Sequence, residues 1–288
     1  MKTSKQMKIK LFLNLCLFSS ILIASLCVYA ETPWNYAEGE QSISISFVDD
    51  RFDRVWEGET EAPIAQVLQQ NVWLGYTIGI TEDISLSAKT GYTKTSKSDI
   101  SKTFEGFSDS SISLKYQLLN EFIDDSIASV SINITGILKG SYERAFAGNP
   151  HAPGNKSNGG EISFQVGKFL KDDIAIYMDL GYKKLIDDVP DDILISTGIY
   201  YSLNKSLDFN LLYGVKRALD GTDIKDPSTG FDPNFFHQTK ENRDWIELSL
   251  NYTFLPANTI NFGGAQVLNG RNTGKSRIFF IGYQYSIY

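Results

Sequence analysis

The two histidines are the only side chains in the sequence that could act as the base of a Ser–His pair. A serine hydrolase would need His151 or His237 within about 3 Å of a serine hydroxyl. Neither has a serine two positions away, which a His-x-Ser pair on one face of a strand would require. The sequence therefore does not predict an enzyme.

Charged side chains on the polar face of alternating segments are a second group that could act on a solute. Lys89 and Lys115 are expected near mid-height on neighbouring strands, and Asp179 could face them across an enclosed interior. One interpretation is a selectivity constriction for small anionic or zwitterionic solutes, because rings of charge set permeation. The other is an interior of salt-bridged, solvated side chains, in which Lys216 pairs with Glu247. The candidate lumen residues are Lys89, Lys115, Asp179, Lys183 and Glu247.

Three aromatic residues in the longest predicted loop, Ala218 to Asn242, form a third group. Phe231, Phe235 and Phe236 are unusual for a solvated loop. They could fold inward as a plug, contact a ligand, or pack locally within the loop.

No motif predicts a cofactor or a metal. Residues 269–276 read NGRNTGKS, but the spacing is one residue short of a P-loop, and a strand follows where a phosphate cradle needs a helix. The acidic residues between 220 and 232 lack the ligand spacing of a calcium site. Cys16 and Cys27 both fall in a segment that we expect to be removed, so the mature chain has no thiol.

Strands must position these residues, and the clearest strand pattern lies between Arg243 and Phe254. Its even positions are all apolar and its odd positions are mostly polar. Successive side chains of a strand point to opposite faces, so this segment has one apolar and one polar face. Twelve segments share the pattern, and the eleventh has the weakest alternation, around Gly263 and Gly264. They are residues 42–47, 72–80, 84–92, 111–118, 129–139, 161–166, 174–183, 193–202, 207–216, 243–254, 259–268 and 276–288.

Segments of about ten residues, tilted by about 40 degrees, cover a hydrocarbon band near 25 Å. The connections alternate between long and short, which in a twelve-stranded barrel puts all short turns at one end. The expected long connections are Arg51 to Val67, a stretch from residue 93 to about Ser108, Ser141 to Asn158, and Ala218 to Asn242.

Aromatic residues on the apolar face supply an independent test of this arrangement, because their position along the barrel axis was not used to define the strands. Near the loop end we expect Tyr92, Tyr182, Tyr213 and Phe279. Near the turn end we expect Tyr116, Tyr201, Tyr252, Phe254 and Tyr285. Two aromatic girdles are typical of a transmembrane barrel, and a soluble sandwich has no reason to sort tyrosine by height.

The first thirty residues read as a secretory signal peptide. Lysines precede an apolar run from Leu11 to Leu26, and Val28-Tyr29-Ala30 fits cleavage after Ala30. Removing four lysines and no acidic residue changes the formal charge from -7 to -11, which argues against a nucleic-acid partner. Residues 31–288 are long enough for one all-β domain.

Over its mature length the chain resembles Gram-negative outer-membrane β-barrel proteins, including an aromatic last residue, Tyr288. The resemblance implies a place in the cell outer membrane, contact with its lipid and lipopolysaccharide, and recognition by the barrel-assembly machinery. Tyr288 is out of phase with the outward-facing Tyr283 and Tyr285, which departs from the usual terminal pattern. Residues 106–109 and 114–116 are also similar to transporter-like barrels annotated under the MetA pathway of phenol degradation.

The sequence thus predicts a twelve-stranded antiparallel barrel that acts as a channel or transporter for passive passage of small polar or anionic solutes. Twelve strands imply a narrow or plugged lumen. The alternative is a surface-exposed structural barrel, with adhesion or exopolysaccharide handling carried by its long loops. A barrel hydrolase is a third, weaker hypothesis.

Overall fold

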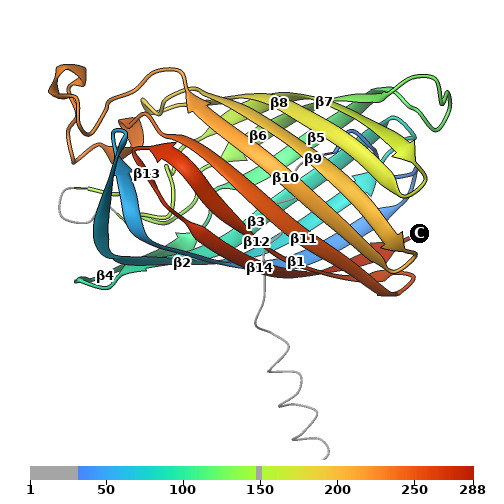
Figure 1. Cartoon of the computed structure of the whole chain (residues 1–288), viewed down its shortest axis with the longest axis horizontal. Coiled ribbons are helices and arrows are strands. Elements are labelled where there is room, and N and C mark those ends of the chain that lie inside the picture. Colours follow the sequence, from blue (N-terminus) through green and yellow to red (C-terminus); the bar gives the residue numbers. More distant parts are fainter. Residues whose placement is uncertain (1–31, 147–150) are drawn as a thin grey trace, which may run out of the picture.

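The strands form one antiparallel sheet that closes on itself. The computed structural model describes residues 32–146 and 151–288, within which fourteen strands pair in a single sheet. Strand β1 (Gln41–Glu57) pairs with β2 (Thr60–Gly79) on one side and with β14 (Arg277–Ile287) on the other, which closes the barrel (Figure 1). The predicted twelve-stranded barrel is confirmed, and the predicted signal peptide lies outside the described residues.

The remaining wall strands follow in chain order, each beside the one before it. They are β3 (Ile84–Lys97), β5 (Ser110–Leu119), β6 (Ser129–Leu138), β7 (Gly159–Lys171), β8 (Ile174–Leu185), β9 (Asp192–Asn204), β10 (Leu207–Ala218), β11 (Asn242–Leu255) and β12 (Asn258–Arg271). Two short strands lie beside β3 and β1, namely β4 (Ile100–Phe107) and β13 (Thr273–Gly274). The described helices are the single turns η1 (Pro227–Thr229) and η2 (Phe236–Gln238), and neither is long or apolar enough to span a membrane.

Long and short connections separate to opposite ends of the barrel, as predicted (Figure 1). Two expected connections are wrong in detail. Arg51 to Val67 is an extension of the β1–β2 hairpin, and the stretch before Ser108 is the end of β3 followed by β4. Strand β12, the segment with the weakest alternation, pairs continuously through its two central glycines. The β1–β2 extension and the end of β3 with β4 are paired strands that continue beyond the membrane band. They have no apolar face, so the sequence shows no alternation of apolar and polar residues by which they could be predicted as strands.

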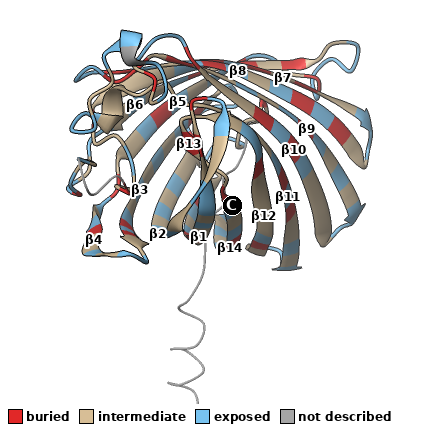
Figure 2. Ribbon diagram, turned by 60° about the vertical axis from the view of Figure 1, so that its left-hand side comes forward, coloured by how far each residue is buried: buried red, intermediate tan, exposed pale blue. Residues whose placement is uncertain are grey.

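The outer face carries the apolar half of each alternation. Leu74, Ile112, Ile134, Leu211 and Leu248 are all exposed. Exposed positions recur along the strands of the wall (Figure 2). Every aromatic residue that the sequence assigned to the two girdles is also exposed. Exposed apolar side chains over the whole circumference are unstable in water but stable against acyl chains, so the geometry fits a lipid-facing surface.

Small polar side chains cover the inner face and bind one another across neighbouring strands. The hydroxyls of Thr77 and Ser87 lie 3.1 Å apart, and those of Ser113 and Thr135 lie 2.8 Å apart. These pairs satisfy hydroxyl groups that would otherwise be desolvated inside the wall. The inner surface is therefore polar but ordered.

Candidate functional site: the lumen and its two ends

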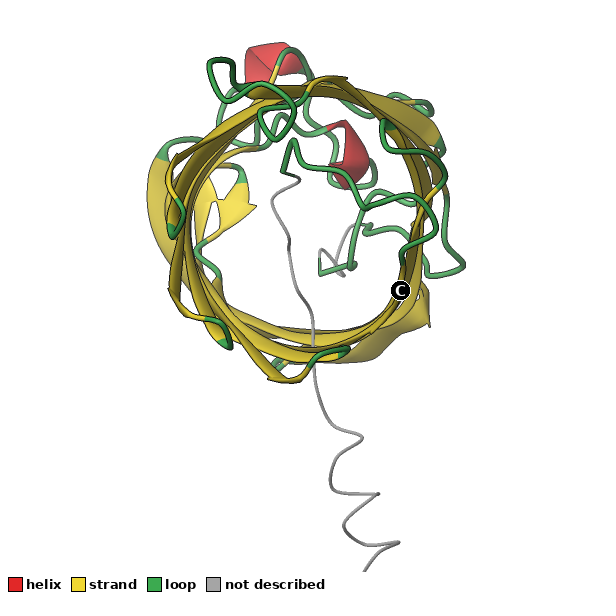
Figure 3. Ribbon diagram, turned by 90° about the vertical axis from the view of Figure 1, so that its right-hand side faces the viewer, coloured by secondary structure: helices red, strands yellow, loops and turns green. Residues whose placement is uncertain are grey.

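The candidate site is the interior of the barrel, which the wall encloses as a ring when it is viewed along the axis (Figure 3). Chain segments from both ends of the barrel enter this interior. At the turn end the segment is residues 32–40, and at the loop end it is part of the β6–β7 connection. Both segments bind side chains that face the lumen.

The segment preceding β1, residues 32–40, folds into the turn end of the lumen and is called the plug below. The Lys115 ammonium donates a hydrogen bond of 2.7 Å to the Thr32 carbonyl. The Asn35 amide side chain accepts a bond of 3.1 Å from Ser85, and its backbone N–H donates to Gln117. These partners face inward from β3 and β5, so the plug lies against the inner wall two to three strands away from β1.

Trp34 fixes the plug to the turn that joins β5 and β6. Its indole N–H donates to the Glu121 carboxylate at 2.8 Å, and its ring lies 5.0 Å from that of Phe169. Glu121 is itself buried and also accepts the Phe169 backbone N–H at 2.8 Å. Trp34 is the main anchor of the plug, because its indole N–H binds a buried carboxylate and its ring packs against Phe169.

The loop between β6 and β7 covers part of the opposite opening. Gln69, which faces inward from β2, donates to the Pro153 carbonyl at 3.3 Å. Tyr142 is 2 % exposed and donates its hydroxyl to Asp109 at 2.8 Å, and the same hydroxyl accepts the Lys156 N–H. The loop is thus attached to the β4–β5 connection beside its own strand β6 and to β2, three places further along the barrel order.

Alternating charges line the lumen just below this loop, and we call them the charged collar. Its members are Glu161, Lys183, Asp192, Lys216, Glu241 and Arg243. The Lys216 ammonium lies 3.2 Å from Asp192 and 2.8 Å from Glu241, and its side chain is only 12 % exposed. Thr273 donates to the other oxygen of Glu241 at 2.7 Å. Burial alone would raise the pKa of Glu241, but Lys216 and Arg243 hold it below its ordinary range.

The expected pair of Lys216 and Glu247 is wrong. Lys216 lies opposite Arg243 on β11, whereas Glu247 lies opposite Leu212, four residues lower. That offset corresponds to about 13 Å along a strand, beyond the reach of one salt bridge. Glu247 is 2 % exposed and faces inward among Leu212, Ser249 and the wall of β12.

The other predicted lumen residues face inward but do not converge on one point. The Lys89 ammonium lies 4.6 Å from the centre of the Trp73 ring. The register places Lys115 opposite Ser85 and Lys89 opposite Ser111, so the two lysines are four residues apart along the wall. Asp179 lies between Gln165 and Ser196, and Lys183 belongs to the charged collar.

Phe231, Phe235 and Phe236 belong to the β10–β11 loop, which is neither the plug nor the β6–β7 loop. The rings of Phe231 and Phe236 are 5.5 Å apart and tilted by 68°, which is an edge-to-face contact. Phe235 is 47 % exposed and lies 6.0 Å from the His237 ring. Two of the three rings therefore pack locally, and the third is available at the surface.

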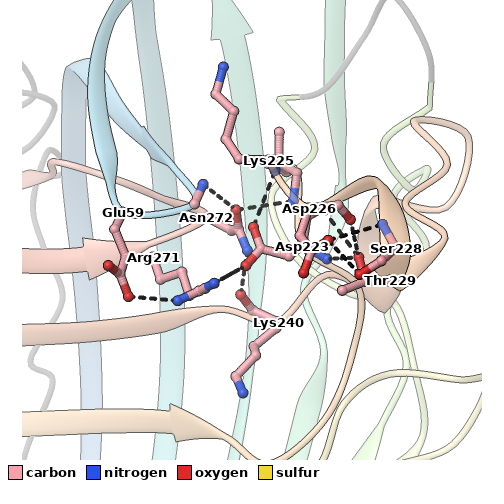
Figure 4. Close-up of polar contacts among 11 residues, drawn as sticks. Glu59, Asp223, Lys225, Asp226, Ser228, Thr229, Lys240, Arg271 and Asn272 are labelled. Atoms are coloured by element: carbon pink, nitrogen blue, oxygen red, sulfur yellow. Dashed lines mark hydrogen bonds and ion pairs between the residues drawn. The ribbon is translucent and has the colours of Figure 1, made fainter.

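A polar network, called the latch below, ties this loop to two neighbouring loops (Figure 4). The Arg271 guanidinium binds Asp223 of the β10–β11 loop at 2.6 Å and Glu59 of the β1–β2 hairpin at 2.7 Å. The Asn272 side chain accepts the Gly58 N–H at 2.7 Å and donates to the Lys240 carbonyl at 2.9 Å. Asn272 has a φ of 52°, a left-handed conformation that asparagine tolerates.

The latch should weaken in acid. Burial acts to raise the pKa of Asp223, but Arg271 and the Lys225 N–H leave it below its ordinary value. A carboxyl group whose pKa is lower in the folded than in the unfolded protein stabilises the fold fully above its unfolded pKa of about 4. It loses this stabilising effect as the pH falls through its folded pKa. A spin label at Asn234→Cys should therefore stay restrained from pH 7 to about 4 and become mobile below that. Asp223→Asn should make it mobile at every pH, and Asp172→Asn, in the β7–β8 turn at the other end of the barrel, should not.

Neither histidine forms a catalytic pair among the described residues. A ring nitrogen of His151 lies 3.0 Å from the Lys102 carbonyl, and its ring packs 4.9 Å from Phe104. Burial lowers the pKa of both His151 and His237. Within residues 32–146 and 151–288, no group of three or more His, Cys, Asp or Glu side chains could hold a metal ion.

The plug is the functional element that sequence reasoning missed. The alternating pattern begins only at residue 42, so it places residues 34–39 before the first strand and indicates no partner for them. The one indication of the plug in the sequence is Pro33-Trp34, an apolar pair in a polar segment that lacks the alternation of a strand. Such a pair needs a buried partner, but the sequence gives no indication that Glu121 supplies it.

No family model matches this sequence, and no curated protein matches it. Solved structures match over most of the chain. An outer membrane channel from Pseudomonas putida F1 superposes with a TM-score of 0.70 at 11% identity, covering 91% of this chain and 100% of that one. The KdgM porin gives 0.53 at 10% identity, covering 86% and 99%. The translocator domain of the autotransporter NalP from Neisseria meningitidis gives 0.50 at 12% identity, covering 87% and 89%.

These likenesses establish the fold, which is that of outer-membrane barrel proteins. Identities of this size carry no information about solute or partner. The resemblance to barrels of phenol degradation stays a prediction.

Proposed function

We propose that this chain is an outer-membrane channel or transporter that lets small polar or anionic solutes pass through a narrow polar lumen. The observation that supports the proposal best is the separation of the two faces of one closed wall. The outer face exposes an apolar band with two aromatic girdles, and the inner face carries hydroxyl, amide and charged groups. Such a wall separates lipid from an aqueous path.

The plug and the loop at the opposite end favour slow, selective passage over an open pore. The plug is held at both Thr32 and Trp34, and the loop is held at Pro153. The charged collar lies between them, so a solute must pass fixed charges of both signs. This arrangement favours small solutes and a low conductance.

Planar-bilayer recording of the refolded chain tests the proposal. We expect small, discrete conductance steps and uptake of small polar solutes into liposomes. A protein that inserts into bilayers without any conductance or solute flux would contradict a channel and would favour the structural alternative, in which the loops carry the function.

The predicted preference for anions depends on Lys89 and Lys115. Replacing both by serine should reduce the Cl⁻ to K⁺ permeability ratio by roughly fivefold, because two positive charges leave a confined lumen. Lys115→Ser should also raise conductance, since it removes the hydrogen bond to Thr32. Reversal potentials in a salt gradient measure the first effect, and an unchanged ratio would remove both lysines from the selectivity site.

The proposed partners follow from residence in the outer membrane. The apolar band would contact lipid and lipopolysaccharide, and the barrel-assembly machinery would insert the chain. Tyr288 is 82 % exposed and follows the last strand directly, so it is accessible for such recognition. The proposal includes no cofactor, no catalysis and no nucleic acid.

A further inference from the structure

One row of the inner wall differs from its polar surroundings. In the register of the sheet it runs from Tyr177 on β8 through Gly198, Leu212 and Glu247 to Ala265 on β12. Residues directly opposite one another in a sheet share a face, and Tyr177, Leu212 and Glu247 are all buried. Glu247 is therefore the one charged residue in a stretch of wall whose other members are apolar, aromatic or glycine.

The Glu247 carboxylate has no counter-ion in the part of the chain that the structure describes. It accepts no hydrogen bond and belongs to no ion pair there, whereas Asp192 and Glu241 of the charged collar share Lys216. Although the residue is almost completely covered, neither carboxylate oxygen is fully enclosed. The tip of the side chain therefore reaches the lumen, where a solute can meet it.

Two aromatic rings lie flat on the wall around Leu212, the neighbour of Glu247. The Trp245 ring covers Gly214, where an added Cβ would lie 2.2 Å from the indole, and the Tyr177 ring covers Gly198 at the same distance. The Tyr177 hydroxyl donates to Asn210 at 2.8 Å and lies within electrostatic range of Glu247. Trp245 and Glu247 are two residues apart on one strand, so both point into the lumen.

These surroundings select the kind of group that can bind the carboxylate. A carboxylate without a donor in apolar surroundings is stable only when it binds a proton or a cation. Ring faces attract ammonium groups, and Leu212 offers an apolar surface to a short alkyl chain. A hydrated metal cation gains little from either contact, so the site favours an organic amine over an inorganic cation.

We propose that Glu247 binds the ammonium group of small amines in the lumen, with their apolar part against Leu212 and the rings of Tyr177 and Trp245. The proposal rests on the channel proposed above, and it adds a class of solute, small molecules that carry an ammonium group and a short apolar chain. Glu247 is then a residue that determines specificity, separate from the charged collar and from Lys89 and Lys115.

Binding of butylammonium to the refolded chain in detergent, measured by ligand-observed NMR, tests the site without requiring conduction. Glu247→Gln should bind roughly tenfold more weakly, because it keeps the shape of the side chain and removes the charge. The matched control Asp172→Asn removes one acid from the β7–β8 turn and should bind as wild type does. Butanol, which has the same chain without the charge, should bind wild type as weakly as butylammonium binds Glu247→Gln. Leu212→Asn keeps the carboxylate and should weaken butylammonium more than methylammonium, which lacks the alkyl contact.

Three results would overturn the proposal. They are equal binding by Glu247→Gln and Asp172→Asn, equal binding of butanol and butylammonium, and full displacement of butylammonium by K⁺ at the same concentration. The first would leave Glu247 as a protonated residue of the wall, and the last would make the site one for inorganic cations. A wild type that binds butylammonium without conducting would contradict only the channel, and a conducting wild type that binds none would contradict only this site.

Discussion

Replacing Trp34 by alanine is expected to shift the plug from docked to undocked by roughly a hundredfold and to raise single-channel conductance. The substitution removes the indole contact with Phe169 and the hydrogen bond to the buried Glu121 carboxylate. Loss of a large packed ring together with a charge-assisted hydrogen bond costs about 3 kcal/mol, which is close to a factor of 100. Planar-bilayer recordings before and after substitution measure the change.

A graded series makes this test specific. Trp34→Phe keeps a ring beside Phe169 but loses the N–H donor, so its conductance should lie between the other two. Trp56→Ala is the matched control, because Trp56 is 6 % exposed but lies in the β1–β2 hairpin beyond the lumen. If Trp34→Ala and Trp56→Ala conduct alike, the plug does not limit passage.

Replacing Lys216 by methionine is expected to shift the channel toward cations by roughly thirtyfold in the K⁺ to Cl⁻ permeability ratio. Methionine fills similar space but leaves the Asp192 and Glu241 carboxylates without their shared cation. One unit charge about 8 Å from a passing ion contributes about 1 kcal/mol at an effective dielectric constant of about 40, with opposite sign for K⁺ and Cl⁻, and the difference of about 2 kcal/mol corresponds to that ratio. Reversal potentials in a tenfold salt gradient measure it.

The same substitution could act through stability, because removing one partner of a buried ion pair costs about 3–5 kcal/mol. The triple variant Lys216→Met/Asp192→Asn/Glu241→Gln separates the two effects. It removes all three charges, so selectivity should return toward that of wild type if the charges act on the ion. Lys205→Met at the turn end should leave selectivity unchanged, and a shift of similar size there would contradict a local role of the collar.

The plug and the charged collar act on different observables, which allows them to be distinguished. In the proposed channel Trp34 lies at the turn end and would set the width of the path, so its variants should change conductance at constant ion preference. Lys216 lies toward the loop end and would set the charge that an ion meets, so its variants should change preference with a smaller effect on conductance. A variant that changes both equally would indicate a general distortion of the barrel.

The sequence alone determined the barrel, its strand number and which side chains face lipid. Alternation along Arg243 to Phe254 is a local property, because strand geometry sends successive side chains to opposite faces whatever the strand pairs with. The heights of Tyr92 and Tyr116 follow from strand direction alone, and both are exposed as expected. Inward positions such as Lys89 and Lys183 could be assigned for the same reason.

Only the tertiary structure decided which inward residues meet. A pairing between strands depends on register, and each residue of offset moves a side chain by about 3.3 Å along the wall. Lys216 therefore meets Asp192 and Glu241 and not Glu247, although all of them could be assigned to the lumen. The docking of Trp34 on Glu121 joins residues 87 positions apart. No periodicity within either segment encodes that contact, because it exists only once the barrel has closed around the plug.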